Sequence, residues 1–254
     1  MKYAKLAGLL LLSSIITVLY SCKKISNSNP LGGSTIARIN LTNSDGEVTY
    51  YRIVYDAAHN VDSIVYTGGG IDTGNDGFLK FSYLNSSYTI TDRGNNYTYV
   101  DINTSLMIDT VTSSTSSDVT YMQYNNGTQI GAVNTKVLTS TYPYYTINIV
   151  DYSYNNGDIT NETFASGAYA YTYDAGHSGQ LGDPQRISQF LQYGRAYTTS
   201  THLATALNYG SDWLETYSYT FDGSGRISQM TRVVNNTSSG GGTDTLRYNY
   251  FYNY

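Results

Sequence analysis

The strongest constraint on the fold is an alternation of aromatic and small polar residues. In the stretch YSYTFDGSGRIS, residues 217–228, the aromatic residues Tyr217, Tyr219 and Phe221 occupy every second position. Successive side chains of a β-strand point to opposite faces, so the three rings share one face and the intervening Ser and Thr residues share the other. This pattern predicts a strand with one packed face, on which the rings of neighbouring strands form cross-strand pairs.

A turn follows the alternating run within the same stretch. Asp222 comes directly after the aromatic residues, and an aspartate in this position accepts hydrogen bonds from amides two or three residues further on. Gly223 and Gly225 are expected to supply positive φ angles. The stretch is therefore interpreted as a complete β-hairpin. The same aromatic alternation recurs at Tyr97 and Tyr99, at Tyr152 and Tyr154, at Tyr169, Tyr171 and Tyr173, and at Tyr248, Tyr250, Tyr252 and Tyr254.

Strands and turns of this type dominate the chain. Runs of Tyr, Ile, Val and Thr bounded by Asn, Asp and Gly recur along it, and their spacing predicts roughly 12 to 14 antiparallel strands joined as a meander. A sheet of so many strands does not stay flat and open. We therefore expect an all-β fold, a large antiparallel meander that is strongly curved or closed as a barrel.

One insertion, at about 175–215, interrupts the meander. Within it Asp183 occupies an N-cap position, Pro184 the first helical position, and Gly194 the position where a helix would end. These signals predict one short helix over residues 183–193.

The predicted helix has an apolar stripe that must cover another part of the fold. Ile187, Phe190 and Leu191 follow the i, i+3, i+4 spacing of one helix face, and the concave side of the sheet is the natural partner. Two roles remain open. The helix completes the core as a plug, or it is a lid over a ligand site, in which case these three residues and Trp213 are the candidate ligand-binding residues.

The N-terminus reads as a lipoprotein signal peptide. Lys2 and Lys5 precede an apolar run that is too short for a membrane span, and the run closes at Cys22, the only cysteine. A cysteine at this point resembles the lipobox of bacterial lipoproteins, which implies that Cys22 carries a lipid. Residues 1–21 are then the signal peptide, residues 22–34 a flexible tether, and residues 35–254 a single β domain.

The charge balance excludes some partners. The chain carries 14 Lys and Arg residues against 19 Asp and Glu residues. Four of the lysines lie within residues 1–24, so the remainder has 10 basic and 19 acidic residues, a net charge of −9. Phosphate backbones repel such a body, so we do not expect nucleic-acid binding. The expected partners are the membrane, through the lipid anchor, and a glycan or protein.

No catalytic constellation stands out. The three histidines lack the spacing of metal ligands, and we expect neither a metal nor a cofactor. The three glutamates are Glu47, Glu162 and Glu215, and nothing in the sequence selects two of them as the acid and base of a glycosidase. We therefore do not expect an enzyme.

Several hairpin phrases resemble a known family. YRIVYDAAHNVDSI (51–64), YTYDAGHSG (171–179) and YTFDGSGRISQM (219–230) resemble the Tyr-Asp phrase of YD-type repeats. The chain as a whole, and residues 169–234 most strongly, is similar to a family of Bacteroidota lipoproteins with a domain of unknown function, described as having a porin-like fold. The resemblance implies a curved antiparallel β fold in the cell envelope and no catalytic residue.

Two functional classes follow. The leading one is a non-enzymatic envelope lipoprotein, at the outer membrane, whose Tyr-rich sheet binds a glycan, a small apolar ligand or a protein, because tyrosine offers a flat ring with a polar tip. The alternative is a structural or assembly accessory without a soluble ligand. The sequence leaves open whether the domain faces the periplasm or the cell exterior.

The C-terminal strand bears on whether the sheet spans the membrane. In LRYNYFYNY, residues 246–254, tyrosines run along one face of the whole strand, and the other face carries Arg247, Asn249, Phe251 and Asn253, which together are too polar for hydrocarbon. A transmembrane barrel needs a continuous apolar band on its lipid face. We therefore expect a water-soluble, lipid-tethered sheet whose tyrosine face is packed and whose asparagine face is wet.

Overall fold

A computed structural model describes residues 35–253 except 69–76, 85, 104, 106, 116–117, 126–128, 138–144, 199 and 239–240. The described residues form sixteen strands and one helix. The strands are β1 (Ile36–Thr42), β2 (Val48–Tyr55), β3 (Val61–Thr67), β4 (Gly77–Leu84), β5 (Ser87–Asp92), β6 (Tyr97–Ile102), β7 (Ile108–Ser113), β8 (Val119–Tyr124), β9 (Ile130–Val137), β10 (Tyr145–Asn155), β11 (Asp158–Phe164), β12 (Gly167–Ser178), β13 (His202–Tyr209), β14 (Trp213–Phe221), β15 (Ile227–Asn236) and β16 (Thr243–Tyr252). The helix is α2 (Pro184–Tyr193).

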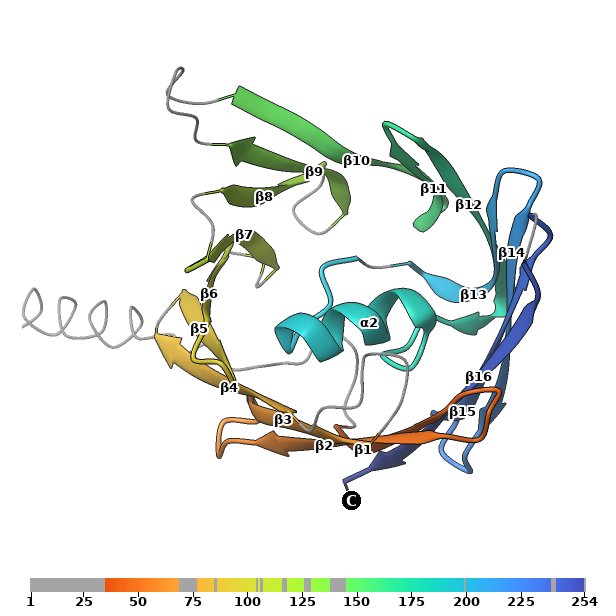
Figure 1. The fold of residues 1–254 in the computed structure, drawn as a ribbon, viewed down its shortest axis with the longest axis horizontal. Coiled ribbons are helices and arrows are strands. Elements are labelled where there is room, and N and C mark those ends of the chain that lie inside the picture. The colour runs from red at the N-terminus through yellow and green to blue at the C-terminus, as the bar shows by residue number, and fades with distance from the viewer. Residues whose placement is uncertain are drawn as a thin grey trace, which may run out of the picture.

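The strands form one closed antiparallel barrel. Each strand pairs with its neighbours in the chain, and β1 pairs with β16 to complete the ring (Figure 1). In this last pair Ile39 lies opposite Tyr250. The predicted all-β barrel with one short helix is confirmed. The sixteen strands exceed the roughly 12 to 14 expected. The insertion predicted at about 175–215 is too long, because β13 and the start of β14 lie within it and the interruption runs only from Ser178 to His202.

The two faces of the barrel wall differ in chemistry. In β14, Glu215 and Tyr217 are buried and point into the barrel, whereas Thr216, Ser218 and Thr220 are exposed on the outside. The same division holds around the wall, since the inward registers carry mostly Tyr and Ile and the outward registers mostly Thr, Ser and Asn. The aromatic alternation therefore marks the lumen side of the wall in β12, β14 and β16. In β6 it does not, because Tyr97 and Tyr99 are exposed on the outside and Val100 and Ile102 face the lumen.

Two of the three Tyr-Asp phrases, at Asp56 and Asp222, end in one recurrent turn, whereas Asp174 of the third lies within β12. Asp222 Oδ1 accepts from the amides of Ser224 at 2.8 Å and Arg226 at 3.0 Å, so the bonds reach two and four residues on instead of two or three. Gly225 has a φ of 77°, whereas Gly223 is not left-handed, contrary to expectation. The left-handed residue lets the chain reverse within a short loop. The same pair of side-chain bonds occurs at Asn43, Asp56, Asp92 and Asn103.

One end of the barrel is held together by tyrosine hydroxyls. We call it the helix end: β1 begins there, β16 ends there, and α2 is inserted there between β12 and β13. At this end the last inward tyrosine of an even-numbered strand donates to a backbone carbonyl at the start of the preceding strand. The pairs are Tyr55 with Ile36, Tyr124 with Ile108, Tyr173 with Ile159, Tyr219 with Ala204 and Tyr252 with Ile227, at 2.5 to 2.9 Å.

Helix α2 lies inside the ring of strands (Figure 1). Its predicted caps are confirmed: Asp183 accepts from the Arg186 amide, Pro184 opens the helix, and Gly194 ends it with a φ of 68°. Two wall tyrosines hold its ends, since Tyr250 of β16 donates to the Gly182 carbonyl at 2.9 Å and Tyr88 of β5 donates to the Tyr193 carbonyl at 2.7 Å. The helix therefore crosses the lumen from one part of the wall to another. No helix among the described residues is long and apolar enough to cross a membrane.

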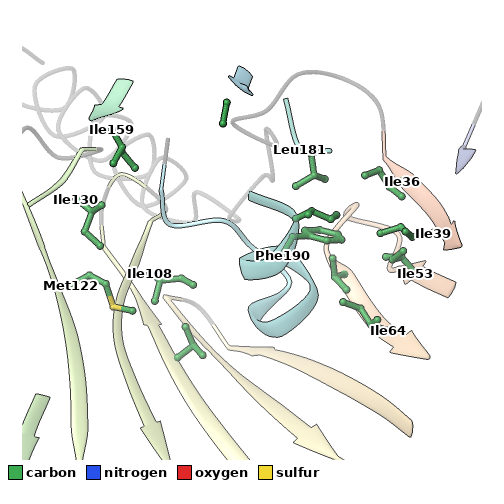
Figure 2. Close-up of a cluster of buried hydrophobic side chains, with 14 of the residues drawn as sticks. Ile36, Ile39, Ile53, Ile64, Ile108, Met122, Ile130, Ile159, Leu181 and Phe190 are labelled. Carbon is green, nitrogen blue, oxygen red and sulfur yellow. The ribbon is translucent and has the colours of Figure 1, made fainter. Parts of the chain in front are cut away.

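The hydrophobic core gathers around this helix (Figure 2). Ile187 and Phe190 of α2 are 2% and 5% exposed. The wall contributes residues that are fully buried at the helix end, namely Ile36, Ile108, Ile130, Ile159 and Ile227. The helix and these side chains fill the lumen at the helix end.

Candidate ligand-binding site inside the barrel

The opposite end of the barrel, which we call the open end, has a different interior. Arg232 lies midway along β15 and faces inward opposite Tyr217, yet 30% of its side chain is exposed. Three more inward side chains are only partly buried: Tyr248 of β16, which pairs with Met230, and Trp213 and Tyr209 at the open end. Inward side chains stay accessible to solvent only where the lumen is unfilled. The barrel is therefore a cup with its floor at the helix end.

Four aromatic residues form an arc around one side of the open end. Phe164, Tyr169, Tyr209 and Trp213 come from the neighbouring strands β11, β12, β13 and β14. Tyr169 pairs with Tyr209 across the strands, and Tyr209 pairs with Trp213. Ring centroids are 5.0 Å apart for Phe164 and Tyr169 and 5.1 Å apart for Tyr169 and Tyr209. We call these four residues the aromatic arc.

A charged pair supports one end of the arc. Glu215 accepts from Arg232 Nε at 2.8 Å and from Nη2 at 2.5 Å. It also accepts from Trp213 Nε1 at 3.0 Å and from the Tyr217 hydroxyl at 2.5 Å. Burial opposes ionisation of Glu215, but the hydrogen bonds from Arg232 and Tyr217 outweigh it and lower its pKa. Glu215 is thus an anion that fixes the orientation of the indole ring.

A second glutamate faces the lumen and ionises less readily. Glu162 of β11 pairs with Tyr152 and Tyr169 in neighbouring strands. Burial raises its pKa to about 7, although a hydrogen bond from Tyr171 partly counteracts the rise. Tyr171 also bonds to Gln185 of α2. The helix, the wall and this carboxyl group are therefore linked through one tyrosine.

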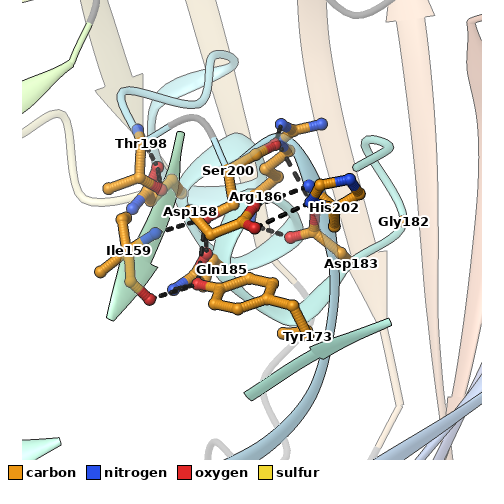
Figure 3. Close-up of polar contacts among 12 residues, drawn as sticks. Asp158, Ile159, Tyr173, Gly182, Asp183, Gln185, Arg186, Thr198, Ser200 and His202 are labelled. Atoms are coloured by element: carbon orange, nitrogen blue, oxygen red, sulfur yellow. Dashed lines mark hydrogen bonds and ion pairs between the residues drawn. The ribbon is translucent and has the colours of Figure 1, made fainter. Parts of the chain in front are cut away.

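A polar network joins α2 to the segment that follows it, and Ser200 of that segment bonds to Ile159 and Tyr173 of the wall (Figure 3). Gln185 accepts from the Ser200 hydroxyl at 3.1 Å, Arg186 donates to the Ser200 carbonyl, and Gln189 accepts from the Thr198 amide and hydroxyl. Burial raises the pKa of Asp183, the N-cap of this helix, to about 6 despite the nearby Arg186. These buried polar groups are occupied with one another, so we assign them a structural role.

A cavity lies beside the other end of α2. Its volume is about 310 Å³. The residues that line it are Leu79, Ile90, Asp92, Asn96, Thr98, Val111, Ser113, Gln192 and Tyr193. All of its wall residues come from the open-end halves of β4–β7 or the turn between β5 and β6, so the cavity belongs to the cup.

The sequence-predicted site residues do not come together. Ile187 and Phe190 lie in the core at the floor of the cup, and Leu191 is partly buried against it. Trp213 lies in the aromatic arc at the open end. That these residues bind a ligand stays a prediction. Cys22, the signal peptide and the tether lie outside the described residues.

Sequence reasoning missed the charged residues of the lumen. Glu162 is in phase with Phe164 in β11, and Glu215 is in phase with Trp213 and Tyr217 in β14. The sequence did carry a signal for them: each glutamate occupies one of the alternate positions at which the aromatic residues stand, and side chains at those positions face the lumen. The described part of the chain contains no cluster of three or more His, Cys, Asp or Glu residues that could hold a metal.

Comparison with known proteins identifies the fold. No protein-family model matches the chain, and no curated protein matches it. A porin-like protein from Bacteroides uniformis ATCC 8492, known from a crystal structure at 2.32 Å resolution, superimposes with a TM-score of 0.64. It is 17% identical and aligns over 87% of this chain and 99% of its own. At this identity the likeness shows the fold alone: the chain has a porin-like β-barrel, as the family resemblance implied.

Proposed function

We propose that this protein is a non-enzymatic, lipid-anchored envelope barrel that binds a ligand in its lumen, from the open end. The observation that carries the proposal is the difference between the two ends. At the helix end Ile36, Ile108 and Ile159 are 0% exposed, whereas at the open end inward aromatic side chains remain accessible. A cup of this shape receives a ligand, and its filled floor blocks passage through the barrel.

The outer wall supports a barrel that stands in water. A membrane-spanning barrel needs an outward apolar band about 25 Å tall. The outward registers of β5 (Ser87, Thr89, Thr91), β14 (Leu214, Thr216, Ser218, Thr220) and β16 (Thr243, Thr245, Arg247, Asn249, Phe251) offer no such band. A lipid on Cys22 would then supply the membrane attachment.

The position of β1 favours one orientation. β1 begins at the helix end, so a tether formed by residues 22–34 joins the barrel at its closed floor. The open end then faces away from the membrane to which the lipid is bound, where a soluble ligand has access to it.

The anchor is tested by Cys22→Ser. The variant should leave the membrane fraction or accumulate as the precursor, because a thioether-linked lipid requires the thiol. Unchanged membrane association and unchanged mobility would contradict the proposed anchor. Residues 23–254 should fold to a β-rich protein in detergent-free buffer, and folding only in detergent or lipid would contradict the water-exposed wall.

Ligand binding is tested with the intrinsic fluorescence of Trp213, the only tryptophan. Residues 23–254 are titrated with neutral and acidic hexasaccharides and with the apolar dye 1-anilinonaphthalene-8-sulfonate. We expect a saturable change in Trp213 emission with at least one probe, because the indole lies at the open end. If no probe changes the emission or gives heat in calorimetry, the binding proposal fails and a structural accessory role replaces it.

A further inference from the structure

The aromatic arc indicates which class of ligand the proposed binding site takes. It places Phe164, Tyr169, Tyr209 and Trp213 on four consecutive strands at one level of the wall. Its ring centroids, 5.0 Å and 5.1 Å apart where neighbouring pairs contact, follow the spacing of adjacent strands. One pyranose unit of an extended oligosaccharide has a similar length, so successive sugar rings can meet successive aromatic rings.

The polar groups beside the arc suit hydroxyl groups. Glu162 and Glu215 face the lumen from β11 and β14, the outer two strands of the arc. Glu215 is 6% exposed and already accepts four hydrogen bonds from Arg232, Trp213 and Tyr217, so Glu162 is the carboxyl group that can accept from a sugar hydroxyl. An aromatic surface beside a carboxyl group matches the two chemical faces of a sugar ring.

The charge beside the arc disfavours an acidic ligand. Arg232 is the basic side chain that contacts this cluster, and Glu215 already binds it through Nε and Nη2, at 2.8 Å and 2.5 Å. Tyr248 bonds to the same guanidinium group. A carboxylate or sulfate on the ligand would meet Glu162, and the charge of Arg232 is already balanced by Glu215.

We propose that the aromatic arc, with Glu162, binds an uncharged oligosaccharide and discriminates against acidic glycans. This inference rests on the proposed binding function. Contact with the aromatic rings of the arc supplies apolar contact area, and Glu162 orients the sugar hydroxyls. Trp213, held by Glu215, lies at one end of the bound chain.

The test compares ligands of one length. Residues 23–254 are titrated by calorimetry and by Trp213 fluorescence with cellohexaose, maltohexaose, laminarihexaose and mannohexaose, and with hexagalacturonate as the acidic counterpart. We expect at least one neutral hexasaccharide to bind at least about tenfold more tightly than hexagalacturonate. If hexagalacturonate binds as tightly or more tightly, the ligand class is wrong and the binding function stands. If only the apolar dye binds, the ligand class is likewise wrong. If nothing binds, both fail.

Variants locate the site on the arc. Tyr169→Leu and Tyr209→Leu keep apolar bulk but remove the flat rings, and we expect each to weaken binding by about tenfold or more. Tyr99→Leu is the matched control, because Tyr99 is 53% exposed on the outer wall. Thermal unfolding and circular dichroism of every variant identify any loss of folding. Unchanged affinity in folded Tyr169→Leu and Tyr209→Leu proteins would overturn the assignment.

Discussion

Glu162 predicts an unusual dependence of stability on pH. The folded state holds the proton of this carboxyl up to a pKa of about 7, against an ordinary value of 4.5. The unfolded chain releases it near pH 4.5. Between these values the unfolded state binds fewer protons than the folded state, so the free energy of unfolding falls as the pH rises and is constant above about pH 7.

The size of the effect follows from the shift. Each pKa unit corresponds to about 1.4 kcal/mol, so the difference between 4.5 and about 7 gives at most roughly 3 kcal/mol between pH 4.5 and pH 8. Glu162→Gln keeps the hydrogen-bonding shape without the charge. We expect the variant to match the wild type near pH 5 and to exceed its stability at pH 8.

The measurement is urea denaturation of both proteins at intervals from pH 4.5 to pH 8. Glu47→Gln is the matched control, since Glu47 is exposed in the turn between β1 and β2, and it should follow the wild-type profile. Burial raises the pKa of Asp183 to about 6. Its ionisation therefore also lowers the free energy of unfolding as the pH rises, but only up to about pH 6. The same titration of Asp183→Asn separates its contribution from that of Glu162. Parallel profiles of wild type and Glu162→Gln between pH 6 and pH 8 would refute the argument.

Three further outcomes concern stability and are measured by urea denaturation at one pH. Phe190→Ala should lower the free energy of unfolding by about 3 to 5 kcal/mol, because Phe190 is 5% exposed in the core, while Ser188→Ala on the exposed side of α2 should change it by less than about 0.5 kcal/mol. Asp222→Ala removes two side-chain bonds to turn amides and should lower the free energy of unfolding. Tyr88→Phe leaves the Tyr193 carbonyl without its donor and should cost about 1 to 3 kcal/mol; no loss would show that this bond does not hold α2.

The sequence predicted those features that depend on neighbouring residues. The alternation of Tyr217, Tyr219 and Phe221 is a property of one strand, and it correctly marks the packed face. The helix signals at Asp183 and Gly194 are likewise local and correctly bound α2. Register within a hairpin follows from its turn, and the Asp222 turn shows how strongly one side chain fixes it.

Closure of the barrel and the make-up of the lumen could not be obtained in the same way. The pairing of Ile39 with Tyr250 joins the two ends of the chain, and no local pattern encodes a contact across such a separation. The cup depends on which inward side chains α2 covers, and this depends on where Tyr88 and Tyr250 hold the helix. Glu215 and Arg232 meet because adjacent strands bring their registers together.

The seam between β1 and β16 has a consequence for how the protein folds. Every other pair in the ring joins strands that are neighbours in the chain, so hairpins can assemble one after another at a small cost in loop entropy. Only the seam requires the last strand of the chain. Before the seam forms, β1 and β16 have unpaired backbone edges that can pair with other chains. Closing the seam is thus the step of highest contact order and the expected slow step of folding. A chain shortened before Thr243 would lack β16 and leave β1 and β15 permanently unpaired at their edges, and we expect it to associate with other chains instead of forming a closed barrel.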